Sequence, residues 1–374
     1  MPRSVLMAAI VTLTACGKAE PVVEPQPLDL PADPAAEGVP VGVRTVLAND
    51  ESFEVWYPAD EDTTGDDDVI SLLTYVPDEV ATLLAEVTIP TWTQHAIRDA
   101  APRPVDAPLP VVVFSHGVSG FRTQSAALCA HLASRGYVVI SVDHPGRDLA
   151  TFAPCLFTPP AGECQLGGMF GDDPAPPQID HMLAWLDAGV DWLDGLADTG
   201  NMGIFGHSAG GFTTTTVTNA NPRFLAALPL AGGGDFTGDA KTAIIGGSCD
   251  GVVGESQLVP SAPTTTDGYW SLAGAGHLAF SDLCKVDMGA VGTQLSTRPD
   301  ANALFIQQLS TLGTDGCPSY TPTASDTCSS EAFLDLDTSD QVLNYAVTAF
   351  FDQKLKQSGP GLEAGAYAQL TKAP

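Results

Sequence analysis

The pentapeptide GHSAG at residues 206–210 constrains this chain more than any other stretch. A short apolar run, residues 202–205, precedes it, and a stretch with helical potential, residues 209–219, follows it. A strand, a tight turn lined by glycines and a helix together predict a nucleophile elbow, with the hydroxyl of Ser208 exposed at its apex. The two glycines remove side chains that would collide with the neighbouring strand and helix. Alone, the pentapeptide also fits a glycine-rich surface turn.

Apolar runs alternate with helical patterns along the rest of the chain. Continuous apolar runs are typical of strands that are buried on both faces of a parallel sheet. We predict strands at about residues 41–47, 53–58, 111–114, 137–142, 202–205, 224–230, 242–246 and 269–272. We predict helices at about residues 124–135, 179–193, 209–219 and 339–355. This alternation predicts an α/β fold in which helices flank a mostly parallel central sheet.

Three segments fit this pattern less well. Apolar residues recur at helical spacing between residues 77 and 97 until Pro90 interrupts them, so we expect a helix that packs beside the site or in the core. Residues 285–335 are an expected insertion on the C-terminal side, with a short helix at about 301–312. This insertion is a candidate lid. Four consecutive threonines, residues 213–216, weaken the helix predicted behind Ser208.

The first residues indicate an export signal. Arg3 supplies a positive charge, and residues 5–13 form an apolar stretch that is too short to span a bilayer. The sequence Leu-Thr-Ala-Cys that ends at Cys16 resembles a bacterial lipobox, in which Cys16 would be lipidated and become the mature N-terminus. An ordinary signal peptide cleaved near Ala15 is the alternative. The lipobox predicts an exported, membrane-anchored lipoprotein that faces the periplasm or the cell exterior.

Composition then divides the chain into three parts. Residues 1–16 are the signal segment with its lipobox. Residues 17–40 are rich in Pro, Ala and Glu and are expected to be an unstructured linker. Residues 41–374 are expected to form a single catalytic domain, because this length suits one large α/β domain with insertions.

The charge of the chain limits its partners. Acidic residues outnumber basic ones 45 to 15, which gives a formal net charge of −30. Such a surface repels the phosphates of nucleic acids and anionic lipid headgroups, so we expect no nucleic-acid partner. Membrane contact is expected only through the lipid at Cys16. No histidine pair stands at a spacing that is typical of metal ligands, so we expect no metal.

The chain contains eight cysteines, which suits an oxidising compartment. With Cys16 set aside, Cys129 lies in a helical pattern and is expected to be a buried free thiol. The other six are disulfide candidates. Spacing and nearness to the predicted site suggest the pairs Cys155–Cys164, Cys249–Cys284 and Cys317–Cys328, and other pairings of the same six stay open.

A serine hydroxyl becomes a useful nucleophile only when a base takes its proton. Enzymes with this elbow supply an acid and then a histidine later in the chain, each on a loop after a strand. Asp250 follows the strand predicted at 242–246, and His277 follows the strand predicted at 269–272. We therefore predict that Ser208 attacks a carbonyl carbon, that His277 takes its proton, and that Asp250 fixes the histidine tautomer.

Other residues compete for these roles. Asp235 is the main rival for the acid because it follows the strand predicted at 224–230, and Asp143 is a weaker rival. His144 ends a strand and is a further choice for the base. His116 is expected to orient backbone, and His207 is expected to pack beside the nucleophile. Three histidines on helical patterns are expected to be structural, namely His95, His131 and His181.

A tetrahedral intermediate also needs two hydrogen-bond donors that point at its oxygen. The main-chain amide of Ala209, directly after the nucleophile, is one candidate. The second is expected in the sequence HGVSG, residues 116–120, which follows the strand predicted at 111–114. The amide of Val118 is the best candidate in that loop.

Together these motifs resemble platelet-activating-factor acetylhydrolase-like proteins of the α/β-hydrolase superfamily. The matching stretches are WYPA at 56–59, FSHGVSGFRT at 114–123, VDH at 142–144, GHSAGG at 206–211 and the Gly-x-x-His at 274–277. The wider group includes dienelactone-hydrolase-like and cutinase-like polyester hydrolases. The resemblance covers about residues 41–280 and the last helix. It implies an α/β-hydrolase fold that cleaves carboxylic esters without a cofactor, with a small-molecule or lipid ester as substrate.

The position of the acid departs from the acetylhydrolase pattern. In those proteins the acid ends the strand that follows the nucleophile helix, which corresponds to Ala231 here. The sequence instead offers Asp250 one strand later, as in dienelactone- and cutinase-like enzymes. We expect a serine esterase that forms an acyl-enzyme on Ser208. A phospholipid or polyester hydrolase, a different acyl acceptor and a non-catalytic surface lipoprotein are the alternatives.

Overall fold

The computed structural model describes residues 28, 30–157, 175–286, 288–306 and 334–373. Its main feature is an 11-stranded sheet in the order β13-β12-β11-β9-β8-β6-β7-β2-β1-β5, with β10 paired to β9. The pairs from β7 through β6, β8, β9 and β11 to β12 are parallel, whereas β1, β2 and β13 include the antiparallel pairings at the edges. The predicted α/β fold with a mostly parallel sheet is confirmed.

The strands are β1 (Val41–Ala48), β2 (Glu51–Pro58), β3 (Asp68–Ser71), β4 (Thr91–Gln94), β5 (Ile97–Arg98), β6 (Leu109–Ser115), β7 (Val138–Val142), β8 (Ala197–His207), β9 (Phe224–Leu230), β10 (Lys241–Thr242), β11 (Ile244–Gly247), β12 (Tyr269–Leu272) and β13 (Leu370–Lys372). The helices are α1 (Asp78–Leu83), α2 (Ala126–Ser134), α3 (Leu149–Phe152), α4 (Pro176–Asp187), α5 (Ala209–Ala220), α6 (Glu255–Leu258), α7 (Met288–Ser296) and α9 (Leu336–Leu355).

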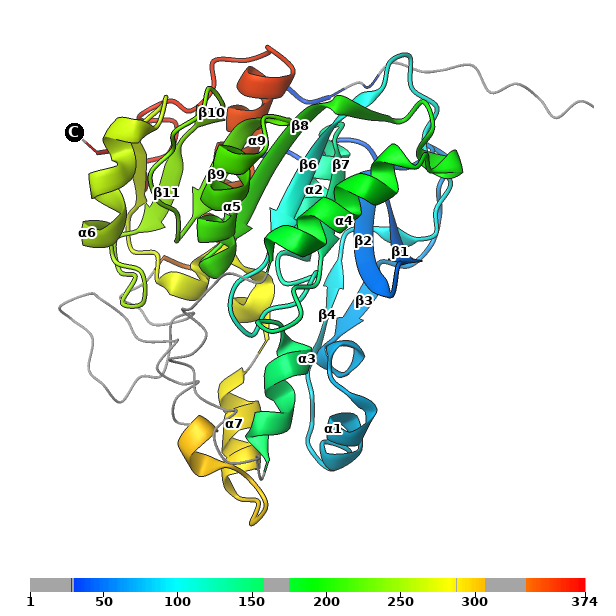
Figure 1. Cartoon of the computed structure of the whole chain (residues 1–374), viewed down its shortest axis with the longest axis vertical. Helices are drawn as coiled ribbons and strands as arrows, with labels where there is room; N and C mark the ends of the chain where they lie inside the picture. Colours follow the sequence, from blue (N-terminus) through cyan, green and yellow to red (C-terminus); the bar gives the residue numbers. More distant parts are fainter. Residues whose placement is uncertain (1–27, 29, 158–174, 287, 307–333, 374) are drawn as a thin grey trace, which may run out of the picture.

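Helices cover both faces of the sheet, as Figure 1 shows with α4 and α5 in front and α2 and α9 behind. The alternation of side chains along each strand explains why both faces are apolar. Val111 and Val113 of β6 pack into the core that includes α4, whereas Val112 and Phe114 pack into the core that includes α2 and α9. A continuous apolar run is therefore required, since neither face of β6 meets water.

A smaller apolar cluster joins α1, the segment after α3, and α7. Val80, Leu84, Phe157, Val291 and Leu295 belong to it. In Figure 1, α1, α3 and α7 lie together beyond one end of the sheet. The insertion therefore contributes at least α7 to a cluster shared with α1, whereas residues 307–333, and with them much of the predicted 301–312 helix, lie outside the described residues.

The single helix predicted between residues 77 and 97 is wrong. Only Asp78–Leu83 is α-helical, and Thr91–Gln94 forms β4, which pairs with β3. In β4 the buried residues are Trp92 and Gln94, at a spacing of two, so this part of the segment has a strand period. Leu83, one of the apolar residues at helical spacing in this segment, is 38% exposed.

The described end of the predicted linker contacts the fold. The main-chain N–H of Val39 donates to the carbonyl of Ser134 at 2.9 Å, and Arg135 donates to the carbonyl of Pro31 at 2.7 Å. His131 also hydrogen-bonds the carbonyl of Pro34 at 2.9 Å. Residues 31–39 thus pack on the C-terminal end of α2, and ordered structure begins before residue 41.

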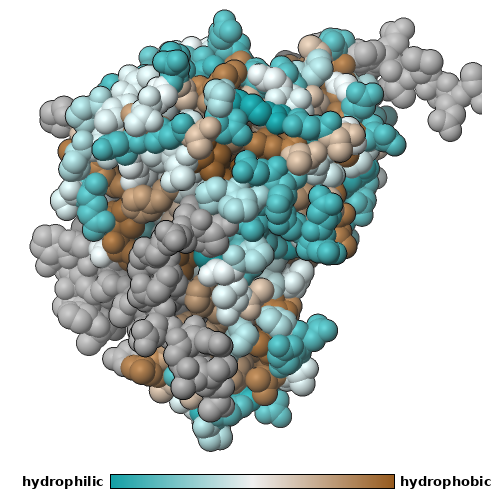
Figure 2. Space-filling model, in the orientation of Figure 1, coloured by the Kyte–Doolittle hydropathy of each residue, from teal (hydrophilic) through white to brown (hydrophobic). Residues whose placement is uncertain are grey.

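Several predictions fall on residues outside the described part of the chain, namely the signal segment with Cys16, half of the 17–40 linker, Cys164, Cys317 and Cys328. Cys129 is a buried free thiol. Within the described residues, no helix has the length and apolarity that crossing a membrane requires. Hydrophilic side chains cover much of the face seen in Figure 2, with apolar side chains exposed between them.

Helix α5 runs through the four threonines that weaken its sequence signal. The hydroxyls of Thr213, Thr214 and Thr215 each donate to the carbonyl four residues earlier, at 3.1, 2.8 and 3.4 Å. These bonds give each buried hydroxyl proton an acceptor within the helix. Tertiary packing against the sheet therefore overrides the low helix propensity of this stretch.

Helix α9 begins one turn earlier than predicted, because Asp335 caps it by accepting from the N–H of Thr338 at 2.9 Å. Its far end packs directly on β8. A methyl group added at Gly203 would lie 2.6 Å from Phe351 and 3.0 Å from Leu355. The missing side chain at Gly203 is thus what allows α9 to approach the central strand.

We predict that Gly203→Ala lowers the free energy of unfolding by about 1–3 kcal/mol, because the added methyl group overpacks the core. Gly292→Ala in α7 is the matched control. A methyl group there meets nothing within 4 Å, so we expect unchanged or slightly higher stability. Urea denaturation of both variants measures the difference, and equal stabilities would contradict the packing argument.

Candidate active site

Ser208 lies at the turn between β8 and α5 with φ 58° and ψ −121°. A positive φ is strained for a residue with a side chain, and such strain is characteristic of functional sites. The two glycines of the pentapeptide permit the turn sterically. A methyl group at Gly206 would lie 2.3 Å from the carbonyl oxygen of Gly210, and one at Gly210 would lie 1.9 Å from that of Ser115. The glycines therefore let α5 start directly against β6 and β8.

The structure brings Ser208, His277 and Asp250 together. His277 Nε2 lies 2.9 Å from Ser208 Oγ, and His277 Nδ1 lies 2.7 Å from Asp250 Oδ2. The other carboxylate oxygen of Asp250 accepts the N–H groups of Val252 and Val253, each at 2.8 Å. His277 and Asp250 are both buried, whereas Ser208 is partly exposed. Main-chain N–H groups of its own loop thus orient the Asp250 carboxylate independently of the imidazole.

This convergence follows from the topology of the sheet. Ser208, Asp250 and His277 come after the carboxyl ends of β8, β11 and β12. These strands run parallel within one sheet, so their carboxyl ends lie at the same edge. Loops at that edge are where α/β sheets place their ligands and reacting groups.

The loop after β6 lies against Ser208 at the same edge. A methyl group at Gly117 would sit 3.2 Å from the Cβ of Ser208. The carbonyl oxygen of Gly117 accepts two hydrogen bonds, from His116 Nδ1 at 2.8 Å and from the N–H of Gly120 at 3.1 Å. Because a trans peptide holds its C=O and N–H on opposite sides, these bonds also fix the N–H of Val118, the predicted oxyanion donor.

His116 therefore makes the backbone contact that the sequence suggested. Its Nε2 accepts the main-chain N–H of His144 at 3.1 Å, so the proton lies on Nδ1. Burial, helped by the positive charge of Arg147, lowers the pKa of His116 to about 3. The ring stays neutral and keeps this tautomer at ordinary pH.

The rival residues lie in other environments. The His144 ring bonds Ser115 Oγ at 2.9 Å, and burial lowers its pKa well below the usual value, so it is a poor base. Asp235 is exposed, and its main-chain carbonyl accepts from Asn219. Asp143 binds Arg122. The three histidines expected to be structural each have a hydrogen-bond partner. His95 bonds Asp67, His131 bonds the carbonyl of Pro34, and His181 bonds Glu51.

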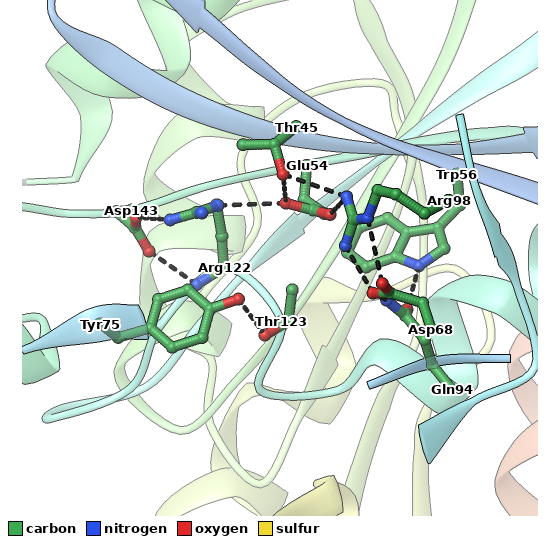
Figure 3. Close-up of polar contacts among 10 residues, drawn as sticks. All are labelled: Thr45, Glu54, Trp56, Asp68, Tyr75, Gln94, Arg98, Arg122, Thr123 and Asp143. Carbon is green, nitrogen blue, oxygen red and sulfur yellow. Dashed lines mark hydrogen bonds and ion pairs between the residues drawn. The ribbon is translucent and has the colours of Figure 1, made fainter. Parts of the chain in front are cut away.

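Two buried arginines beside the site were missed from the sequence. Arg122 follows the oxyanion loop, and its main-chain N–H and Nη1 donate to Asp143 at 2.7 and 2.6 Å. Its Nε donates to the buried Glu54 at 3.2 Å. Figure 3 shows Glu54 between Arg122 and Arg98. The network ties the end of the oxyanion loop to β2 and to the loop after β7.

Arg147 is the second buried arginine. Its Nη2 donates to Ser115 Oγ at 2.9 Å and to the carbonyl of His116 at 2.8 Å, and its Nη1 donates to Thr213 Oγ1 at 2.7 Å. It therefore joins the end of β6 to α5 beneath the elbow. The FRT residues in the loop motif were the only signal for Arg122, and no local pattern indicated Arg147, because its partners come from distant parts of the chain.

No group of three or more His, Cys, Asp or Glu side chains suited to a metal ion occurs in the described ranges. The arrangement of Ser208, His277 and Asp250 has what nucleophilic catalysis by a serine requires, namely an oriented base and an acid that orients it.

The family model for platelet-activating factor acetylhydrolase, isoform II, matches residues 43–163. That range contains the oxyanion loop but ends before Ser208. A platelet-activating factor acetylhydrolase from Cavia porcellus is 24% identical over 213 residues, which cover 49% of this chain and 47% of the relative. One from Gallus gallus is 31% identical over 118 residues, covering 31% and 27%. The chain thus spans less than half the length of these two relatives.

Among solved structures, a ferulic acid esterase from Streptomyces cinnamoneus superimposes with a TM-score of 0.54 and 20% sequence identity. The superposition covers 90% of this chain and 97% of the esterase. At this identity the likeness concerns the fold. The chain therefore has the α/β-hydrolase fold, and over residues 43–163 it is similar to the platelet-activating factor acetylhydrolase isoform II family.

Proposed function

We propose that this protein is a serine hydrolase that cleaves carboxylic esters through an acyl-enzyme on Ser208. The observation that carries the proposal is the continuous hydrogen-bonded chain from Ser208 Oγ through the His277 ring to the Asp250 carboxylate, at 2.9 and 2.7 Å. The similarity to acetylhydrolases and the fold shared with an esterase support it.

The proposed mechanism assigns one step to each group. Asp250 accepts the Nδ1–H of His277, which leaves Nε2 free to accept the proton of Ser208 as its oxygen attacks the ester carbonyl. The N–H groups of Val118 and Ala209 stabilise the developing oxyanion. The His277 imidazolium then protonates the leaving alcohol. Water repeats the sequence and releases the acid.

The substrate is proposed as a small-molecule or lipid ester. Similarity to acetylhydrolases favours a short acyl group on a phospholipid. The proposed acid, Asp250, lies one strand after Ala231, the position that corresponds to the acid of acetylhydrolases. This placement favours instead the arrangement of cutinase-like polyester hydrolases. Initial rates with acyl esters of graded length, a phospholipid and a polyester distinguish the two.

We predict that Ser208→Ala abolishes hydrolysis of p-nitrophenyl acetate and butyrate, because no other described hydroxyl contacts His277 Nε2. A fluorophosphonate probe should label wild type at Ser208 and leave the variant unlabelled. Exposed Ser256 supplies the control Ser256→Ala, which should keep full activity. Retained activity in Ser208→Ala would contradict the mechanism, and an unlabelled, inactive wild type would favour a non-catalytic lipoprotein.

We predict that Asp250→Asn lowers kcat by about 10³- to 10⁴-fold, because an amide facing Nδ1 favours the wrong histidine tautomer. Asp235→Asn is the matched control. Asp235 is exposed, so its variant should retain activity close to wild type. Steady-state kinetics on both proteins measures the ratio, and a larger loss in Asp235→Asn would overturn the assignment of the acid.

The location of the protein is also a proposal. We propose an exported lipoprotein anchored through Cys16, with disulfides among the six candidate cysteines. The sequence that ends at Cys16 and the buried free thiol at Cys129 support it. We expect mass spectrometry of protein from a bacterial host, digested without reduction, to find a lipid on Cys16 and cross-links that exclude Cys129. An unmodified Cys16 would contradict the lipid anchor, and a cross-linked Cys129 would contradict the choice of disulfide cysteines.

A further inference from the structure

Gln124 is a buried glutamine that lies two residues before the start of α2 and close to the oxyanion loop. Its Oε1 accepts the main-chain N–H of Gly117 at 3.1 Å. The side chain needs the space left by Gly120, since a methyl group there would lie 2.1 Å from that oxygen. The amide is thus packed against the peptide that precedes the predicted oxyanion donor.

The other end of the same amide reaches His207. Gln124 Nε2 lies 2.8 Å from His207 Nδ1, and His207 Nε2 lies 2.8 Å from the carbonyl oxygen of His277. A carbonyl only accepts, so His207 Nε2 carries the proton and Nδ1 is the acceptor. The N–H of Gly117 only donates, so it fixes the amide with its oxygen on that side. Each hydrogen bond from Gly117 to the His277 carbonyl therefore has only one possible donor and one possible acceptor.

His207 remains neutral in this setting. Burial, with the neighbouring His277 as a smaller cause, lowers its pKa to about 3. A second proton on His207 would make Nδ1 a donor that faces the donor Nε2 of Gln124, and the hydrogen bond between them would be lost. The other titratable groups around Gln124 are His116, beside Oε1 in the space at Gly120, and Asp282, whose N–H donates to the Gln124 carbonyl at 2.9 Å.

The backbone of Gln124 is held independently of its amide. Besides the bond from Asp282 to the Gln124 carbonyl, the Asp282 carboxylate accepts the N–H of Ala127 at 2.8 Å and pairs with Lys285 at 3.0 Å. Changing the Gln124 side chain therefore leaves the start of α2 anchored to the segment that follows His277.

We propose that Gln124 and His207 are positioning residues that hold the oxyanion loop and the main chain of His277 in register with each other. The three hydrogen bonds link Gly117, in the loop after β6, to His277, in the loop after β12. Neither loop alone fixes the distance between Gly117 and His277. The inference rests on the proposed ester hydrolysis, and it adds two residues that contact neither the nucleophile's hydroxyl nor the acid.

The test uses Gln124→Glu, which removes the donor to His207 Nδ1 and keeps the acceptor for the N–H of Gly117. An ionised carboxylate still accepts from Gly117 but offers no proton to His207 Nδ1. One added proton, on the carboxyl or on the ring, restores a donor between them. We therefore expect kcat to fall about 10- to 100-fold at high pH, with KM little changed. The ratio of variant to wild-type kcat should rise as the pH falls from 10 to 6. Gln124→Leu should show a loss that does not depend on pH.

A second pair of variants tests the His207 end. The amide of His207→Gln can still donate to the His277 carbonyl, so this variant should keep more activity than His207→Leu. Tyr137→Phe is the control, since buried Tyr137 precedes β7, at the opposite edge of the sheet from Ser208, and its hydroxyl donates to Asp352 at 2.7 Å. It should lose stability but keep wild-type kcat per site titrated with fluorophosphonate, which also corrects every variant for misfolding.

The outcomes separate the inference from the proposed function. Inactive wild type would defeat the proposed function. Active wild type with a pH-independent ratio for Gln124→Glu, or equal activity in His207→Gln and His207→Leu, would overturn the positioning role alone.

Discussion

The contact between Gly210 and the carbonyl of Ser115 is the constraint on which the site depends. With no side chain at Gly210, the first turn of α5 lies directly on the end of β6, where a methyl group would be 1.9 Å from the Ser115 oxygen. That approach forces Ser208 into its positive φ and places it beside Gly117. The nucleophile and the oxyanion loop thus meet through backbone contact, and any larger residue at Gly210 would separate them.

Buried polar groups hold this arrangement in place. Burying a charge is costly unless hydrogen bonds and an opposite charge compensate. Arg122 meets Asp143 and Glu54, and Arg147 donates to a serine, a threonine and a carbonyl. The histidines behind the site are neutral donors and acceptors of fixed direction instead. A site built in this way resists small displacements, because moving one group leaves several others without partners.

Prediction from sequence succeeded where one local signal governed the outcome. The apolar runs of β6, β7 and β9 have no other stable place than the interior of a parallel sheet. Prediction failed between residues 77 and 97, where helix and strand periods overlap and Pro90 was taken as an interruption of one helix. The strand period of Trp92 and Gln94 has meaning only because β3 pairs with that segment. The end of the linker was misjudged for a similar reason, since its hydrogen bonds go to α2.

The sequence by itself determined the elbow, the α/β fold and the order Ser208, Asp250, His277, because each depends on residue types and on neighbours within a few positions. Only the tertiary structure decided which polar groups meet. Four hydrogen bonds join residues far apart in the sequence. The separations are 69 residues for Ser208–His277, 27 for Asp250–His277, 83 for Gln124–His207 and 70 for His207–His277. Hydrogen bonds act over about 3 Å, so such pairs exist only once the sheet has brought the carboxyl ends of its strands together.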